Sequence, residues 1–303
     1  MNKGIKIILK RLLKYLACTL PVFAAIGIEA MVLVFFSLGY YLMVAVLTTV
    51  KLSSKGITNP DEIMEQIQRA MLSAEMNHIL EILAVVICGV VFIFWYKNTV
   101  KYERKIKYSS VINKKNIGII VLVGMGGQFT TAGLLSAILP YLEWLNHNYS
   151  EAMESIVSGS LITVIISTVL VAPVVEELIF RGVILHKMRK VIPFLGANIS
   201  QAAIFGICHL NIVQGLYAFG IGLILGYVAK KFKTIFAPMV LHMTLNATGF
   251  LVSAFPDAFI TYLILMVFGA ALLVFGLYRI KMAQEPLTVA EEPNPLLWKD
   301  GMY

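Results

Sequence analysis

Charged residues are scarce in this sequence. Only 14% of its 303 residues are Asp, Glu, Lys or Arg, whereas 59% are hydrophobic, and the mean hydropathy is +0.82. Soluble domains carry about 25% charged residues, so the composition excludes that class and predicts a polytopic membrane protein. The formal charge of +8 then indicates membrane topology, because Lys and Arg collect in cytoplasmic loops. No nucleic-acid partner is expected.

Cysteine motifs and metal motifs are missing as well. The three cysteines, Cys18, Cys88 and Cys208, stand far apart, and no CxxC or Cys/His spacing indicates a disulfide framework or a zinc knuckle. We therefore expect them to be small core residues. No HExxH segment is present, so no helix offers two His ligands one turn apart. The lack of a strong internal repeat disfavours a transporter built from inverted halves.

Long apolar stretches define the fold class. A spanning helix needs about 20 apolar residues, and eight stretches meet that measure. The sequence therefore predicts an all-α polytopic membrane protein with about eight transmembrane helices. The expected spans are residues 22–49, 79–96, 117–139, 158–180, 197–212, 214–230, 235–253 and 258–278.

The loops between these spans predict the orientation of the chain. Residues 97–116 hold seven Lys or Arg residues against the single acid Glu103, whereas residues 140–157 hold three Glu residues and no Lys or Arg. Because basic loops face the cytoplasm, both termini are expected to be cytoplasmic. The compact size and short loops favour an integral protein of a bacterial cell membrane.

Five regions follow from this pattern. The N-terminal residues place basic side chains on one helix face and apolar side chains on the other, which is typical of a helix lying on the membrane surface. The regions are an amphipathic membrane-surface helix at 1–16, an N-terminal transmembrane region with three spans at 17–156, a core with the polar motifs at 157–253, a last transmembrane helix at 254–281 and a disordered cytosolic tail at 282–303.

Three charged residues interrupt the fourth apolar stretch. Glu176, Glu177 and Arg181 lie within six positions, and an ionised side chain near the middle of a membrane helix costs on the order of 3 kcal/mol. Such residues mark a functional site by default. Glu177 and Arg181 are four positions apart and can form an ion pair on one helix face. Glu176 has no partner at an ideal spacing in its own helix, which favours a role as an acid or base.

Further polar residues fall at a similar depth. With a rise of about 1.5 Å per residue, Glu176, His209, His242 and Asn246 lie roughly 12–21 Å from the cytoplasmic ends of their helices. Phe205, one turn before His209, is interpreted as packing that holds the histidine face. The common depth predicts a shared site, which a substrate would reach through the membrane or through a cavity that opens inward.

A carboxylate, two imidazoles and a carboxamide suit the hydrolysis of an amide. Glu176 and His209 can activate a water molecule as general base and orienting group, while His242 and Asn246 can stabilise the developing oxyanion. The same atoms also suit a metal site, with Glu176, His209 and His242 around Zn²⁺ and a bound water. The sequence leaves both mechanisms open.

These residues resemble the motifs of a known family. EELIFR at 176–181, FGICH at 205–209 and HMTLN at 242–246 are similar to the EExxxR, FxxxH and HxxxN motifs of the CPBP intramembrane proteases. That family includes the type II CAAX prenyl endopeptidases and bacterial proteins linked to bacteriocin processing or immunity. The resemblance covers residues 157–252. It implies catalytic roles for Glu176, His209, His242 and Asn246, with Glu177, Arg181 and Phe205 in support.

The resemblance implies an intramembrane endopeptidase that cleaves a membrane-embedded or lipidated peptide or protein. In eukaryotic members the cut follows a prenylated cysteine. Members are often called metalloproteases, yet a metal-independent glutamate mechanism is also argued, so the family does not decide whether Zn²⁺ is a cofactor. The alternative from another class is a non-proteolytic membrane scaffold or bacteriocin-immunity protein of the same fold, whose phenotype would survive the loss of Glu176.

Overall fold

The computed structural model describes residues 3–71, 74–101, 103, 106–256 and 258–288, and helices are the regular elements throughout this part of the chain. The predicted all-α polytopic membrane fold is therefore confirmed. The α-helices are α1 Lys3–Ala17, α2 Leu20–Ser53, α3 Pro60–Met71, α4 Ala74–Thr99, α5 Lys114–Ile138, α6 Glu143–Val157, α7 Leu161–Ile165, α8 Ala172–Glu177, α9 His186–Arg189, α10 Phe194–Ile207, α11 Ile212–Phe232, α12 Phe236–Val252 and α13 Phe259–Met282. Short 3₁₀ turns are η1 Tyr108–Ser110 and η2 Leu139–Tyr141, and π-helical segments are η3 Ile166–Val171 and η4 Leu178–Leu185.

Six helices in the described part are long and apolar enough to cross a membrane. They are Ile5–Ser53, Met76–Thr99, Lys114–Tyr141, Leu161–Arg189, Ile212–Phe232 and Phe259–Met282. The two other expected spans are the apolar helices α10 and α12, with 14 and 17 residues. At 1.5 Å per residue they reach only about 21 and 26 Å, less than the roughly 30 Å of a hydrocarbon core.

The segment Leu161–Arg189 is one continuous helix with two π-helical stretches. The segment η3 precedes Pro173, and the backbone N–H of Ala172 donates to the carbonyl of Ser167. Proline has no N–H to donate, so the wider π turn before it accommodates the break in the hydrogen-bond ladder. The helix also continues past the predicted end at residue 180, which keeps both glutamates inside a continuous helix.

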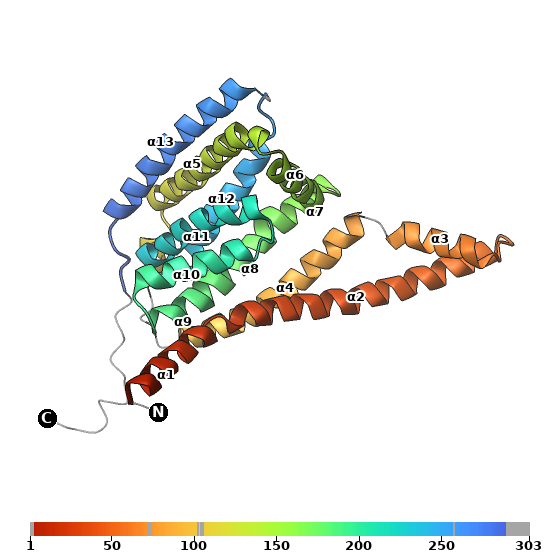
Figure 1. The fold of residues 1–303 in the computed structure, drawn as a ribbon, viewed down its shortest axis with the longest axis horizontal. Helices are drawn as coiled ribbons and strands as arrows, with labels where there is room; N and C mark the ends of the chain where they lie inside the picture. Colours follow the sequence, from red (N-terminus) through yellow and green to blue (C-terminus); the bar gives the residue numbers. More distant parts are fainter. Residues whose placement is uncertain (1–2, 72–73, 102, 104–105, 257, 289–303) are drawn as a thin grey trace.

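Basic residues collect at one end of the bundle. The Lys231 ammonium donates to the carbonyl of Lys281 at 3.0 Å and Lys233 pairs with Glu285 at 2.7 Å, which ties α11 to the end of α13. We call this region the basic end; it is defined by Lys97, Lys114, Lys190, Lys231 and Lys281. Helix α6 lies at the opposite end, far from the start of α1 and the end of α13 (Figure 1).

Part of the predicted tail packs against this basic end. The backbone N–H of Lys107 donates to the carbonyl of Leu287 at 2.7 Å, and Ile106 forms an isolated antiparallel bridge with Thr288. The hydrogen bond from Lys233 lowers the pKa of the exposed Glu285 carboxyl. Residues 289–303 of the tail predicted at 282–303 lie outside the described residues.

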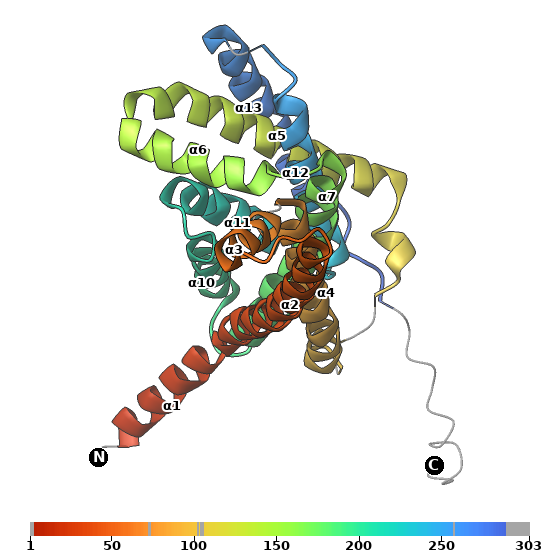
Figure 2. The same cartoon turned by 90° about the vertical axis from the view of Figure 1, so that its right-hand side faces the viewer.

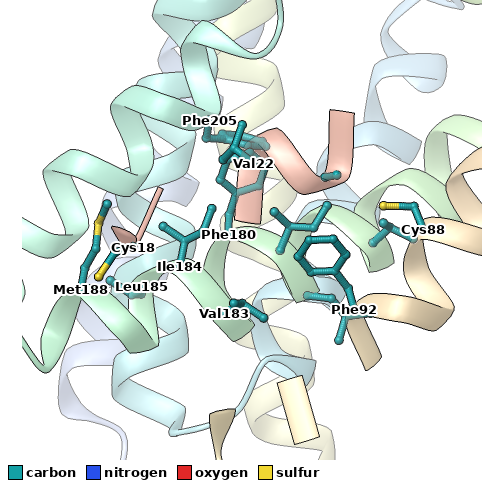
Figure 3. Packing of buried hydrophobic residues seen from close by; sticks show 14 of the residues in the cluster. Cys18, Val22, Cys88, Phe92, Phe180, Val183, Ile184, Leu185, Met188 and Phe205 are labelled. Atoms are coloured by element: carbon teal, nitrogen blue, oxygen red, sulfur yellow. The ribbon is translucent and has the colours of Figure 1, made fainter. Parts of the chain in front are cut away.

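A packed apolar core fills the bundle near the basic end. Four side chains are fully buried there: Phe92 of α4, Val183 and Ile184 of η4, and Met188 of α9 (Figure 3). Cys18 and Cys88 belong to the same core, as expected, whereas Cys208 is partly exposed. A second cluster lies between α5, α11 and α12; its innermost members are Ile120, Leu225, Val228, Phe232, Ala237 and Leu241.

Helix α11 approaches α10 closely because glycines face the contact. A Cβ atom added to Gly226 would lie 1.8 Å from the Asn198 side-chain oxygen, and one added to Gly222 would lie 3.0 Å from the Cβ of Ala202. The buried carbonyl of Gly222 accepts hydrogen bonds from Gln201 and Arg181. Through this carbonyl, α11 connects α10, which carries Phe205, to η4, which carries Arg181.

Candidate active site

Glu176 and Glu177 are neighbours in α8, but their surroundings differ. The Glu177 side chain is fully buried, whereas the Glu176 side chain is 32% exposed and lines a cavity. Successive residues of a helix are rotated by about 100° around its axis. That rotation separates the two carboxylates, so one faces the protein interior and the other faces open space.

Glu177 is the centre of a buried polar chain. Arg181 Nη1 donates to Glu177 Oε1 at 2.7 Å, which is the ion pair that the four-residue spacing predicts. His242 Nδ1 lies 3.0 Å from the same oxygen. Because an ionised carboxylate only accepts hydrogen bonds, Nδ1 is the protonated nitrogen in this contact. The chain from Arg181 through Glu177 thereby fixes the tautomer and the orientation of the His242 ring.

His242 turns its second nitrogen toward Glu176. The distance between His242 Nε2 and Glu176 Oε2 is 3.7 Å, longer than a direct hydrogen bond. His242 comes from α12 and Glu176 from α8, so the pair joins two helices that are distant in sequence. A gap of this size between two polar atoms suits a bridging water.

Phe205 is the packing centre of the two histidines. Its ring centroid lies 4.8 Å from that of His209 and 5.9 Å from that of His242, both in edge-to-face geometry. The Arg181 guanidinium carbon lies 4.5 Å from the same ring centroid. His209 Nδ1 lies 2.8 Å from the Phe205 carbonyl oxygen and is therefore the donor, which leaves Nε2 as an acceptor.

His209 follows the end of α10, in the turn that leads into α11. The next residue, Leu210, has φ of +55° and is 94% exposed. A left-handed conformation is unusual for Leu, and such strain often accompanies functional positions. Asn211 caps α11 through its Oδ1 and donates from Nδ2 to the carbonyl of Asn148 in α6. These bonds hold the turn in place beside α6.

Asn246 lies one turn after His242 in α12. Its Nδ2 donates to the carbonyl of Thr168 at 2.7 Å, and Thr168 belongs to the π-helical segment η3. Because a carboxamide nitrogen carries two hydrogens, Asn246 retains a second donor after this bond. The π-helical segment therefore supplies the anchor that orients the carboxamide.

One cavity brings the predicted residues together. It has a volume of about 1150 Å³, and Glu176, Phe205, His209, His242 and Asn246 all line it. Glu177 and Arg181 lie behind this lining and are buried. Further polar side chains on the cavity wall are Gln128, Thr131, Tyr149, Thr168, Gln214 and Tyr217. Burial raises the pKa of the Tyr149 hydroxyl, so this group remains protonated near neutral pH.

The structure adds a carboxylate that the motif search missed. Glu29 of α2 accepts a hydrogen bond from the Cys88 thiol and interacts electrostatically with Glu176. The signal was present in the sequence, because Glu29 is the only charged residue between Leu20 and Val50. An ionisable residue within a membrane span is a functional candidate by default.

The donor set does not form a zinc site in this arrangement. Within the described ranges, no three His, Cys, Asp or Glu side chains are grouped closely enough to hold one metal ion. A structural or catalytic zinc site needs at least three such protein ligands at about 2.0–2.2 Å, so we derive no step through a metal.

Metal removal is therefore expected to leave peptide cleavage unchanged. Hydrogen bonds to Glu177, the Phe205 carbonyl and the Thr168 carbonyl orient the His242, His209 and Asn246 side chains without a metal ion. The measurement is the initial cleavage rate of the purified protein before and after dialysis against a chelator, together with its zinc content. Stoichiometric zinc whose removal stops cleavage would contradict this prediction.

The motif-bearing region matches a family of membrane proteases. Residues 158–248 match one protein family. Its description is "Type II CAAX prenyl endopeptidase Rce1-like". This range contains all of the motif residues, from Glu176 to Asn246. The resemblance to CPBP intramembrane proteases is thereby confirmed over this region.

One relative of this chain also has the name of a membrane peptidase. The Bacillus subtilis (strain 168) protein named "Putative membrane peptidase YdiL" is 25% identical over 138 residues. The match covers 44% of this chain and 56% of that protein, so the chain spans little more than half of its relative's length. No solved structure shows a significant match to this chain.

Proposed function

We propose that the protein is an intramembrane endopeptidase that hydrolyses a peptide bond in a membrane-associated peptide or protein. The observation that carries this proposal is the facing pair of Glu176 Oε2 and His242 Nε2, 3.7 Å apart at the wall of the cavity. A carboxylate and an imidazole at this spacing can share one water molecule beside a substrate carbonyl that enters the cavity. The relatives' protease names support the same reaction class.

In the proposed reaction Glu176 is the general base. Its Oε2 takes a proton from a water molecule, whose oxygen then attacks the carbonyl carbon of the scissile bond. His209 Nε2 is free to accept the other hydrogen of that water, because Nδ1 is bound to the Phe205 carbonyl. When the tetrahedral intermediate collapses, the C–N bond breaks and Glu176 passes its proton to the leaving amine. The products are a carboxylic acid and an amine, which ionise to a carboxylate and an ammonium group once the acid passes its proton to the amine.

His242 and Asn246 stabilise the oxyanion in this proposal. For this role His242 first takes up a second proton from solvent at Nε2, so that Nδ1 donates to Glu177 and Nε2 donates to the oxyanion. The second hydrogen of Asn246 Nδ2 is directed by the bond of the first to Thr168. Donors positioned in this way before the reaction are worth about 3–4 kcal/mol each. Arg181 and Glu177 act as positioning residues, since Glu177 contacts His242 and Arg181 holds Glu177, while neither contacts the reacting atoms.

The experiment that tests the proposal compares two histidine variants. The protein is reconstituted into liposomes with a set of membrane-embedded peptides, and cleavage products are identified by mass. His209→Ala is expected to lower the rate by about 10²-fold, because it removes a group that orients the water. His147→Ala in α6 is the matched control, since His147 is exposed and outside the cavity.

Equal rates for the wild type and His209→Ala would overturn the role of His209. A wild-type protein that cleaves none of the peptides, together with a cellular phenotype that survives Glu176→Gln, would favour the non-proteolytic scaffold or immunity protein. The two functions therefore give opposite results for the same set of variants.

A further inference from the structure

The cavity is closed toward the basic end and open at the other end. On the side of the basic end it is lined by Phe205 and His242, which are only 2% and 6% exposed. Behind them the apolar core of Val183, Ile184 and Met188 fills the bundle (Figure 3). The exposed large hydrophobic residues of the lining are instead Tyr141, Phe259 and Val157, at 82%, 65% and 54%.

These exposed residues belong to helix ends that carry no basic cluster. Val157 ends α6, Phe259 begins α13, and Tyr141 ends the short η2 turn after α5. Other lining residues also come from helix ends without a basic cluster: the start of α4, the start of α11 and the end of α12. The Lys and Arg residues of α4, α5, α11 and α13 lie at the other ends of those helices.

Helix α6 forms one wall of this opening. It lies between α5 and α11 (Figure 2), and Tyr149, Ser150 and Met153 line the cavity. It contains Glu143, Glu151 and Glu154 with no Lys or Arg. Basic residues mark the cytoplasmic side of a membrane protein, so the opening beside α6 belongs to the non-cytoplasmic side.

We infer that the site receives its substrate from the non-cytoplasmic face of the membrane. This inference rests on the proposed protease function and names its substrate class: a polypeptide segment exposed at, or inserted from, the non-cytoplasmic side. The cavity wall suits such a segment, because it combines the amide and hydroxyl groups of Gln128, Gln214 and Tyr217 with apolar side chains such as Leu135 and Ile221.

The depth of the site sets the length of the segment. Glu176 follows Leu161, the first residue of α7, by 15 positions, which corresponds to about 22 Å of helix. An extended chain covers roughly 3.3–3.6 Å per residue, so about six or seven extended residues reach from the opening to Glu176. The substrate is therefore a polypeptide that can adopt an extended conformation over about six or seven residues. Its scissile bond would lie about six residues below the non-cytoplasmic surface.

Cysteine labelling tests the direction of access. A charged, membrane-impermeant thiol reagent is added to intact cells that express Ser253→Cys or Gln128→Cys, which place thiols at the opening and halfway along the cavity wall. Lys190→Cys at the basic end is the matched control, and the unmodified protein gives the background from its native cysteines. We expect external labelling of Ser253→Cys and Gln128→Cys, and labelling of Lys190→Cys only after permeabilisation.

A second readout links access to turnover. Cleavage of a membrane peptide by Gln128→Cys is measured before and after external labelling, and labelling is expected to stop it. Labelling of Lys190→Cys from outside, or of Gln128→Cys only from inside, would overturn the inference whether or not the protein cleaves anything. Unchanged cleavage by externally labelled Gln128→Cys would overturn it too. External labelling without any cleavage by the unlabelled protein would instead refute the proposed function.

Discussion

Replacing Glu176 by Gln is expected to lower peptide cleavage by at least about a hundredfold, because a general base contributes roughly 10²–10⁴-fold to such reactions. Gln preserves the size of the side chain and one acceptor oxygen, but its amide nitrogen only donates and it cannot take a proton from water. Glu176 is partly exposed to the cavity and lies 3.7 Å from His242 Nε2, so the change removes no buried ion pair. The measurement is the initial rate in liposomes at matched protein amounts.

Glu151→Gln is the control for this variant. It makes the same chemical change on the exposed surface of α6, outside the cavity lining, and should leave the rate unchanged. A Glu176→Gln protein that melts like the wild type and cleaves at the wild-type rate would refute the assignment of Glu176 as the base.

Replacing Arg181 by Met is expected to destabilise the protein by about 3 kcal/mol or more. Arg181 and Glu177 are both fully buried and 2.7 Å apart, and removing one partner of a buried ion pair typically costs about 3–5 kcal/mol. The remaining Glu177 carboxylate would keep only its contact with His242, since its second oxygen has no hydrogen-bond partner in the structure. The measurement is the free energy of unfolding in detergent micelles.

The double variant Arg181→Met with Glu177→Gln separates charge from packing. It removes both charges, so we expect most of the lost stability to return. Cleavage should nevertheless stay low, because His242 Nδ1 no longer donates to a carboxylate that fixes its ring. Wild-type stability for Arg181→Met alone would show that the buried pair is not a stabilising requirement of the fold.

Much of the helical framework could be predicted from the sequence because it depends on local patterns. Apolar stretches located all eight apolar helices, and the spacing of four residues located the Glu177–Arg181 ion pair. The start of α3 also depends on a local contact, because the Asn59 side chain accepts a hydrogen bond from the N–H of Asp61 two residues later. Each of these features involves residues within a few turns of one another.

The other features depend on packing between distant segments. Neither π-helical stretch could be predicted, since periodicity does not distinguish a π turn from an α turn. The contact between His242 and Glu177 joins residues 65 positions apart, and the electrostatic interaction between Glu29 and Glu176 joins residues from α2 and α8. Depth estimates placed the site residues in one layer, but only the packed helices show at which end their cavity opens.

The short helix α10 has a consequence for the surrounding lipid. Its outer side chains Leu195, Ile199 and Ile207 are exposed, yet its 14 residues reach only about 21 Å. A hydrocarbon core of roughly 30 Å is thicker than this wall, and a bilayer adapts to a short wall by thinning beside it. The leaflet would thus be compressed next to His209, which brings headgroups and water closer to the site from the side of the protein.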